Sequence, residues 1–187
     1  MVELILGGAR SGKSALAEET ARQWCAQNPS HRVIYVATAE IHDEEMAQRI
    51  AHHRARRPPE WGLVEAPHAL YQTLLAHSTP DTLLLVDCLT LWLSQWVCAV
   101  APADQDDALV GTEGASIEAA RSALLDALRR LPGPVLLVSN EVGSGIVPMG
   151  ALSRLFSDEQ GRLNQHVAAL ADRVTLVVAG LPLVLKG

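Results

Sequence analysis

A glycine-rich stretch near the start of the chain carries residue types suited to binding phosphate. Residues 7–14 read GGARSGKS, which fits the pattern G-x-x-x-x-G-K-S, and they follow an apolar run and precede a helical pattern. Glycines let backbone N–H groups turn toward phosphate oxygens, and the helix N-terminus adds partial positive charge. Lys13 can neutralise the β- and γ-phosphates, and Ser14 can ligate Mg²⁺. A glycine turn that merely happens to carry Lys and Ser fits this order of strand, loop and helix less well.

A carboxylate at the end of an apolar run could complete a metal site. The run TLLLVD ends at Asp87, and a Mg²⁺ site beside bound phosphates usually takes an acidic residue from the end of a neighbouring strand. The position suits a Walker-B role, with Ser14 as the other protein ligand. An ordinary helix cap or strand-end aspartate is the alternative, and local evidence leaves it open.

Two adjacent histidines followed by three arginines stand out in a chain of net charge −6. On a helix over about 43–57, residues three, four and seven apart share a face, so His53 and Arg57 lie on the apolar stripe. His52 is rotated about 100° away. A neutral imidazole can attack phosphorus and form a phosphoramidate, while the arginines neutralise phosphate charge. A structural core histidine and a solvated basic helix end remain the alternatives.

A polar, glycine-rich loop follows the apolar run PVLLVSN. In open α/β sheets, ligands bind at loops that follow the carboxyl ends of strands, so residues 140–145 are a candidate site for a second substrate. A tight structural turn is equally consistent with these residues. The next helical segment carries polar residues on several faces, which could line a cleft or a subunit interface: Arg154, Asp158, Arg162, Asn164 and Gln165.

The elements that must position these residues are short apolar runs that alternate with helical patterns. Most runs are continuously apolar, which is typical of strands covered by helices on both faces. The alternation predicts an α/β fold with a mostly parallel central sheet, formed by residues 1–187 as a single domain. We expect strands at 2–6, 32–38, 63–66, 82–87, 134–140 and 173–180, and helices at 13–27, 43–57, 69–77, 90–100, 116–131 and 152–171.

Composition argues against several classes of protein. A net charge of −6 disfavours a general nucleic-acid binder, because such proteins usually show a broad basic face. The segment 82–101 is long and apolar but contains Asp87 and Gln95, so a strand leading into a helix is expected rather than a membrane span. Three cysteines without a CxxC pair give no disulfide framework. Together with the absence of a visible export signal, this indicates a cytoplasmic protein.

The order and spacing of these segments resemble the bifunctional adenosylcobinamide kinase / adenosylcobinamide-phosphate guanylyltransferase family of cobalamin biosynthesis. The resemblance runs from Met1 to about Lys186 and implies a P-loop NTPase-type α/β fold. It also implies two reactions. ATP or GTP phosphorylates adenosylcobinamide, and GMP from GTP is then transferred through a guanylylated histidine to adenosylcobinamide phosphate, giving adenosylcobinamide-GDP and pyrophosphate. The segments that carry the resemblance are GGARSGKS, YVATAE, DEEMAQRIAHHRARRPPEW, VEAP, LLVDCLTLWL, VSNEVGSGIVP and GRLNQHVAALADRVTLVVAG.

The resemblance further implies particular residues and partners. The guanylylated residue implied is His53. With the sequence features above, we expect Mg²⁺ with GTP or ATP as substrates, no tightly bound organic cofactor, no nucleic acid and no membrane insertion. Family members commonly assemble as homotrimers. Asp87 stands where the family can have Glu, so its role as a metal ligand or a guanine contact stays open. The implied nucleotide contacts are Gly7, Gly8, Ala9, Arg10, Ser11, Gly12, Lys13, Ser14, Thr38, Ala39, Glu40, Arg54, Ala55, Arg56, Arg57, Glu65 and Asp87.

Two other functions are compatible with the phosphate loop alone. The first is a single-activity P-loop kinase of a small alcohol, which would transfer the γ-phosphate without a covalent GMP intermediate. The second is a nucleotide-switched binding module, in which hydrolysis changes the affinity for a partner and no small molecule is modified. The loop over 101–116 matches no motif and favours none of these functions.

Overall fold

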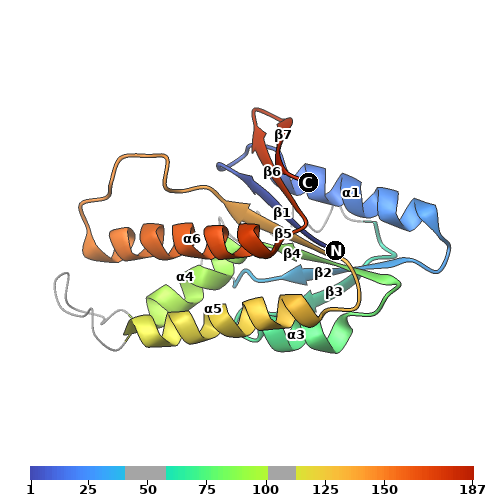
Figure 1. The fold of residues 1–187 in the computed structure, drawn as a ribbon, viewed down its shortest axis with the longest axis horizontal. Helices are drawn as coiled ribbons and strands as arrows, with labels where there is room; N and C mark the ends of the chain where they lie inside the picture. Colours follow the sequence, from blue (N-terminus) through green and yellow to red (C-terminus); the bar gives the residue numbers. More distant parts are fainter. Residues whose placement is uncertain (41–57, 101–112) are drawn as a thin grey trace.

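A seven-stranded sheet forms the centre of the computed structural model, which describes residues 1–40, 58–100 and 113–187 (Figure 1). Every neighbouring pair of strands is parallel except β6 and β7, which are antiparallel. The prediction of a mostly parallel α/β sheet is therefore confirmed. Across the sheet the strands are β3 (Gly62–Glu65), β2 (Arg32–Ala37), β4 (Thr82–Asp87), β5 (Val135–Asn140), β1 (Val2–Gly7), β6 (Arg173–Val178) and β7 (Leu181–Lys186).

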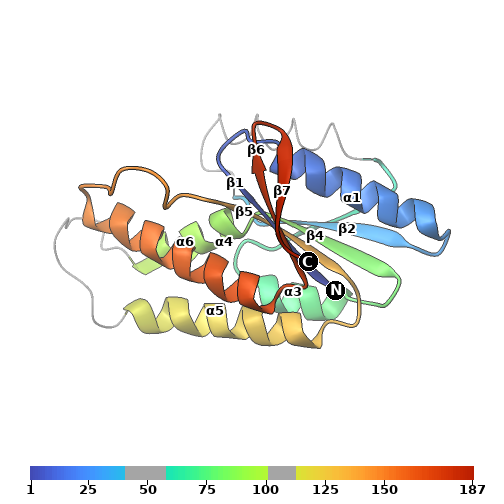
Figure 2. The same ribbon diagram turned by 45° about the horizontal axis from the view of Figure 1, so that its top comes forward.

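Helices cover both faces of this sheet (Figures 1 and 2). One helix, α1, lies on one face, and the other described helices lie on the opposite face. The helices predicted within the described residues agree with these bounds to within three residues at each end, whereas the one expected over 43–57 lies outside the described residues. The helices are α1 (Lys13–Gln27), α3 (Leu70–His77), α4 (Leu89–Val100), α5 (Glu113–Arg130) and α6 (Ala151–Leu170).

The strands read as continuous apolar runs because both of their faces are buried. On β4, Leu83 and Leu85 pack in the cluster that includes Ala17 and Ala21 of α1. Their neighbours Leu84 and Val86 belong to the cluster built with α3, α4, α5 and α6. Successive side chains of a strand point to opposite faces, so a strand between two helical layers is apolar at every position.

One strand was not predicted. The chain reverses after β6 at Ala179 and Gly180, whose φ angles are 52° and 79°, and β7 then pairs antiparallel with β6. Two central residues with positive φ are characteristic of the type I′ hairpin turn, but Ala-Gly is not among its strongest sequence signals. Pro182 also argues against a strand, and it is tolerated here because β7 is the edge of the sheet.

The apolar segment that raised the question of a membrane span is strand β4 followed by helix α4. This confirms the expected strand leading into a helix. Over residues 1–40, 58–100 and 113–187, no helix has both the length and the apolar character needed to cross a membrane.

Candidate active site at the carboxyl edge of the sheet

The parallel strands bring the predicted site residues of the described chain to one edge of the sheet. Register places Ala37 of β2 beside both Glu65 of β3 and Asp87 of β4, and Gly7 of β1 beside Asn140 of β5. Residues 8–14 continue from β1 and residues 38–40 continue from β2. His53 and residues 54–57 lie outside the described residues. The remaining predicted contacts thus surround the carboxyl ends of four adjoining or nearby strands.

The phosphate loop curls back on itself at the start of α1. Gly12 has a φ of 101° and caps the helix, and its carbonyl accepts the N–H of Leu16 at 3.0 Å. Lys13 is the first residue of the helix, and its Nζ donates to the carbonyl of Gly8 at 3.0 Å. The ammonium group is thereby held over the loop whose backbone N–H groups would face a phosphate.

Two glycines of this loop are required by close approach. A Cβ on Gly7 would lie 2.4 Å from Ser11 Oγ and 2.6 Å from the carbonyl oxygen of Val177. A Cβ on Gly12 would lie 3.2 Å from the Cα of Gly180. The N–H of Gly180 also donates to the carbonyl of Ser11 at 2.8 Å. The β6–β7 turn therefore packs against the phosphate loop and hydrogen-bonds to it. The sequence of the turn contains no signal for this role.

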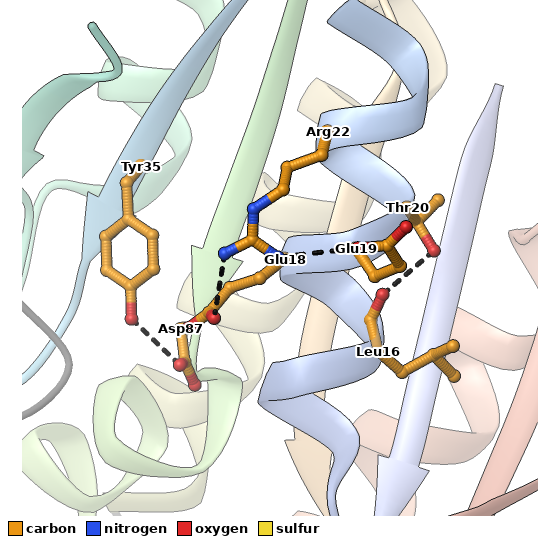
Figure 3. A network of polar contacts seen from close by, with 7 residues as sticks. All are labelled: Leu16, Glu18, Glu19, Thr20, Arg22, Tyr35 and Asp87. Atoms are coloured by element: carbon orange, nitrogen blue, oxygen red, sulfur yellow. Dashed lines mark hydrogen bonds and ion pairs between the residues drawn. The ribbon is translucent and has the colours of Figure 1, made fainter. Parts of the chain in front are cut away.

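The negative charge of Asp87 influences Lys13 across the site. Lys13 is buried, and this burial lowers the pKa of its ammonium below the ordinary value, while the negative charge of Asp87 acts in the opposite direction. The Asp87 carboxylate also accepts a hydrogen bond of 2.8 Å from the Tyr35 hydroxyl (Figure 3). A buried Tyr hydroxyl usually finds a polar partner, so the Tyr in strand β2 was a signal that sequence reasoning overlooked.

The residue after Asp87 is held from the neighbouring strand. Thr38 is fully buried, its hydroxyl donates to the carbonyl of Cys88 at 2.7 Å, and the N–H of Cys88 donates back to Thr38 Oγ1 at 2.9 Å. Burial raises the pKa of the Cys88 thiol to about 12. This thiol is therefore neutral near pH 7 and unsuited to act as a nucleophile.

The other predicted nucleotide contacts near β2 are more exposed to solvent than Thr38. Ala39 and Glu40 are half-buried and Glu65 is exposed. Glu40 Oε1 lies 3.1 Å from Nε2 of His68, which places the segment after β2 against the segment after β3.

A buried carboxylate on α1 was also missed. Glu18 is 1% exposed, and one of its oxygens lies 3.7 Å from Arg22, one helical turn further along (Figure 3). Arg22 lies 3.5 Å from the more exposed Glu19 as well. The i,i+4 spacing of Glu18 and Arg22 was the available signal for an ion pair on this helix.

The end of β5 is fixed beside the phosphate loop. The N–H of Glu141 donates to the carbonyl of Gly7 at 3.1 Å, and the N–H of Asn140 donates to Thr90 Oγ1 at 2.8 Å. Asn164 donates through Nδ2 to the carbonyl of Asn140 at 3.0 Å. Its Oδ1 accepts bonds from two buried side chains, those of Ser139 and Gln160. Asn164 is thus an internal anchor rather than part of a cleft or subunit interface.

The other polar residues predicted on α6 line a pocket. Its volume is about 470 Å³, and the loop over 142–148 forms its second wall. A cleft is one of the two options left open by the sequence, and a subunit interface at the same surface stays a prediction. The α6 residues with predicted polar roles that line it are Arg154, Asp158, Arg162 and Gln165.

The few oxygen ligands at this edge suit Mg²⁺ that is bound together with a nucleotide. They do not suit a metal ion whose ligands all come from the protein. Within the ranges that the structure describes, no group of three or more His, Cys, Asp or Glu side chains is arranged to hold a metal ion. Mg²⁺ beside a nucleotide normally takes one or two protein oxygens and completes its shell with phosphate oxygens and water. The hydroxyl of Ser14 and the carboxylate of Asp87 are suitable protein oxygens.

Comparison with known proteins identifies the family. The chain matches the family described as "Cobinamide kinase / cobinamide phosphate guanyltransferase" over residues 3–185. It is 48% identical over 187 residues to the "Bifunctional adenosylcobalamin biosynthesis protein CobP" of Pseudomonas aeruginosa, and the match covers 100% of this chain and 98% of that protein. Proteins named "Bifunctional adenosylcobalamin biosynthesis protein CobU" in Escherichia coli and Salmonella typhimurium are 40% and 39% identical, with 100% of both chains covered in each case.

These matches favour the bifunctional enzyme over the single-activity kinase and over the nucleotide-switched binding module. They extend across the phosphate loop, the segment with the two histidines and the loop after β5, so they do not rest on the generic phosphate loop alone. The chain belongs to the cobinamide kinase / cobinamide phosphate guanyltransferase family, and it is a transferase with the two activities that the family name states.

Proposed function

We propose that residues 1–187 act as one catalytic domain that performs both reactions at the carboxyl edge of its sheet. In the first, ATP or GTP phosphorylates the hydroxyl of the aminopropanol arm of adenosylcobinamide. In the second, GMP from GTP is transferred to the resulting phosphate, giving adenosylcobinamide-GDP and pyrophosphate. The observation that carries the proposal is the placement of Lys13, over the phosphate loop, beside the electrostatic influence of Asp87 at the end of β4.

In the kinase reaction, the chain supplies positioning and positive charge. The loop 7–14 would hold the β- and γ-phosphates through its backbone N–H groups, and Lys13 would offset the negative charge that develops on the transferred group. Ser14 and Asp87 would hold Mg²⁺, which would supply positive charge to offset the negative charge of the phosphates. Because Asp87 is already oriented by Tyr35, its carboxylate is fixed before the nucleotide arrives.

In the guanylyl transfer, His53 would act as a nucleophile. An imidazole nitrogen attacks the α-phosphorus of GTP, the bond from this phosphorus to the bridging oxygen breaks, and pyrophosphate leaves. A phosphate oxygen of adenosylcobinamide phosphate then attacks the same phosphorus, and the N–P bond breaks. Arg54, Arg56 and Arg57 would stabilise the charge on the pyrophosphate, and Ala55 would contact the nucleotide within the same segment. Support for His53 comes from its helical phase and from the family resemblance.

The remaining predicted contacts divide by accessibility. Ala39 and Glu40, which are half-buried, and Glu65, which is exposed, would contact the base or ribose of the nucleotide. Thr38 would act indirectly, because its hydroxyl is engaged by Cys88 and its side chain is fully buried. We expect it to fix the peptide that follows Asp87 rather than to touch the nucleotide through its side chain. A homotrimer remains an expectation from the resemblance, and a cytoplasmic location remains an expectation from the sequence.

Labelling with GTP tests the guanylyl step. After incubation with GTP labelled at the α-phosphorus, the protein should carry an acid-labile, alkali-stable label, and His53→Asn should lose it. His52→Asn is the matched control, because its predicted phase turns it away from the apolar stripe, and it should retain the label. Label on His53→Asn would exclude this residue as the nucleophile.

A second labelling experiment separates the two activities. GTP or ATP labelled at the γ-phosphorus should transfer label to adenosylcobinamide in the presence of Mg²⁺, and His53→Asn should retain this transfer. If γ-phosphate is transferred but no protein is labelled from the α-position, the chain uses another route for its second reaction.

A further inference from the structure

The loop that joins β5 to α6 exposes several large apolar side chains. Ile146 is 98% exposed, Val147 is 74% exposed and Met149 is 95% exposed. They stand together within four residues of sequence, whereas the apolar residues that precede them on β5 are fully buried. Clustered exposed apolar side chains mark a binding surface more often than isolated ones do.

This loop runs alongside the first half of α6 (Figures 1 and 2), and the pocket of about 470 Å³ lies between the two. The two walls differ in chemistry. Ile146, Val147 and Pro148 contribute from the loop. The α6 wall contributes the guanidinium groups of Arg154 and Arg162, the carboxylate of Asp158 and the amide of Gln165. A ligand that fits both walls must present an apolar face together with hydrogen-bonding groups at its rim.

Both ends of the loop are attached to fixed parts of the molecule. At the start, the N–H of Glu141 donates to the carbonyl of Gly7 in the phosphate loop. At the end, the Arg154 guanidinium donates to the carbonyl of Pro148 at 3.2 Å and also to that of Met149. The loop that forms one wall of the pocket is therefore attached at its start to the phosphate loop, where an acceptor of phosphate must arrive.

We propose that this pocket binds the corrin ring of the cobinamide substrate. The ring offers apolar, methyl-bearing faces and a rim of primary amides, which matches the apolar loop and the polar face of α6. Amide N–H groups can donate to Asp158, and amide groups can both donate to and accept from Gln165. The ring is larger than the pocket, so one edge enters it and Ile146 and Met149 contact a face. The aminopropanol arm then extends toward Gly7 and the phosphates.

The inference rests on the proposed function, because it places a substrate of that reaction. It adds a location for the corrinoid that is separate from the nucleotide contacts. It also gives the loop after β5 a role in selecting the acceptor, while the loop 7–14 and Asp87 serve the nucleotide.

Kinetics with adenosylcobinamide as the varied substrate test this assignment. We expect Ile146→Asn and Gln165→Ala each to raise the KM for adenosylcobinamide about tenfold or more, since the loss of one well-packed or hydrogen-bonded contact is typically of that size. The KM for the nucleotide and the kcat at saturating corrinoid should stay within twofold of the unmodified protein. Leu75→Asn is the matched control, because Leu75 is also a partly exposed apolar residue but lies near the end of α3, away from this loop.

Equilibrium dialysis of adenosylcobinamide, followed by its visible absorbance, provides a direct second measurement. Weaker binding by the two pocket variants, with unchanged binding by Leu75→Asn, supports the assignment. If KM and binding are unchanged in both pocket variants while the unmodified protein phosphorylates adenosylcobinamide, the pocket is not the corrinoid site although the proposed function stands. If the unmodified protein transfers no phosphate to adenosylcobinamide at all, the proposed function itself fails.

Sedimentation velocity distinguishes another occupant of the same surface. If Ile146→Asn lowers the oligomeric mass and leaves the KM for adenosylcobinamide unchanged, the apolar loop is a contact between copies of the chain and the assignment is wrong. An unchanged sedimentation coefficient with a raised KM supports the corrinoid site.

Discussion

The hydroxyl of Thr38 pairs with both backbone polar groups of Cys88, accepting from its N–H at 2.9 Å and donating to its carbonyl at 2.7 Å. The two residues are fifty positions apart in the chain, and both are buried. This contact ties the segment after β2 to the segment after β4. Asp87, which immediately precedes Cys88, is thereby held at the carboxyl edge of the sheet.

Replacement of Thr38 by Val should destabilise the protein. The change keeps the side-chain shape but leaves the N–H and the carbonyl of Cys88 buried without this partner, which typically costs about 1–3 kcal/mol of unfolding free energy. Urea denaturation should report this loss. Thr38→Ser keeps the hydroxyl and is expected to recover most of the stability. Equal stabilities for Thr38→Val and the unmodified protein would show that the contact is not needed to hold the segment.

Gly7 and Gly8 should respond differently to replacement by Ala, although they are adjacent. A Cβ on Gly7 would overlap Ser11 Oγ at 2.4 Å and the carbonyl oxygen of Val177 at 2.6 Å, whereas a Cβ on Gly8 meets nothing within 4 Å. Overpacking of this kind typically costs about 1–3 kcal/mol. Differential scanning calorimetry should therefore show a lower melting temperature for Gly7→Ala and a near-unchanged one for Gly8→Ala. Similar melting temperatures would mean that the loop relaxes around the added methyl group.

Replacement of Lys13 by Met should separate activity from stability. Loss of the ammonium should reduce kcat for phosphate transfer by a factor of about 100 or more, the usual effect of removing a group that stabilises transition-state charge. The melting temperature should not fall, because burial already disfavours the charged lysine, as the lowered pKa of Lys13 shows. A variant that is inactive because it is unfolded would contradict this interpretation, and circular dichroism identifies that case directly.

Glu3 should make the stability of the protein depend on pH. The residue is buried in β1, and burial raises the pKa of its carboxyl group above the ordinary value, although Arg173 acts in the opposite direction from 3.6 Å. A raised folded-state pKa means that the folded protein binds the proton more tightly than the unfolded chain does. The associated stabilisation is complete below the pKa of the unfolded chain, whose ordinary value is 4.5, and it is lost as pH rises through the folded pKa.

Glu3→Gln is the variant that tests this dependence. It should be more stable than the unmodified protein at pH 7. The difference in stability should shrink or reverse as the pH falls below the pKa that the Glu3 carboxyl group has in the unfolded chain. Urea denaturation at pH 7 and at a pH below the unfolded pKa measures the difference. Glu118→Gln, at an exposed position on α5, is the control and should show no such dependence. A constant difference at all pH values would indicate that Arg173 compensates the charge of Glu3.

Local sequence patterns were enough to predict the features that depend only on residues close together in the chain, namely the strands and the phosphate loop. The apolar runs became strands because helices on both sides bury every position of them, as on β4. The order of strand, glycine loop and helix placed Lys13 and Ser14 at a helix N-terminus without reference to the rest of the molecule. The segment with His53 was assigned in the same way, from helical phase, and its role remains a prediction.

Contacts between distant segments were decided only by the tertiary structure. Strand β7 was not predicted, because Pro182 argues against a strand and Ala179–Gly180 is a weak turn signal. Proline is tolerated in an edge strand, and only the structure shows that β7 is at the edge of the sheet. Thr38 and Asn164 read as site residues or cleft residues, yet their polar groups are used by Cys88 and Asn140. Which group a side chain faces depends on strand order and register, and these follow from burial of the whole sheet rather than from the residues near it in sequence.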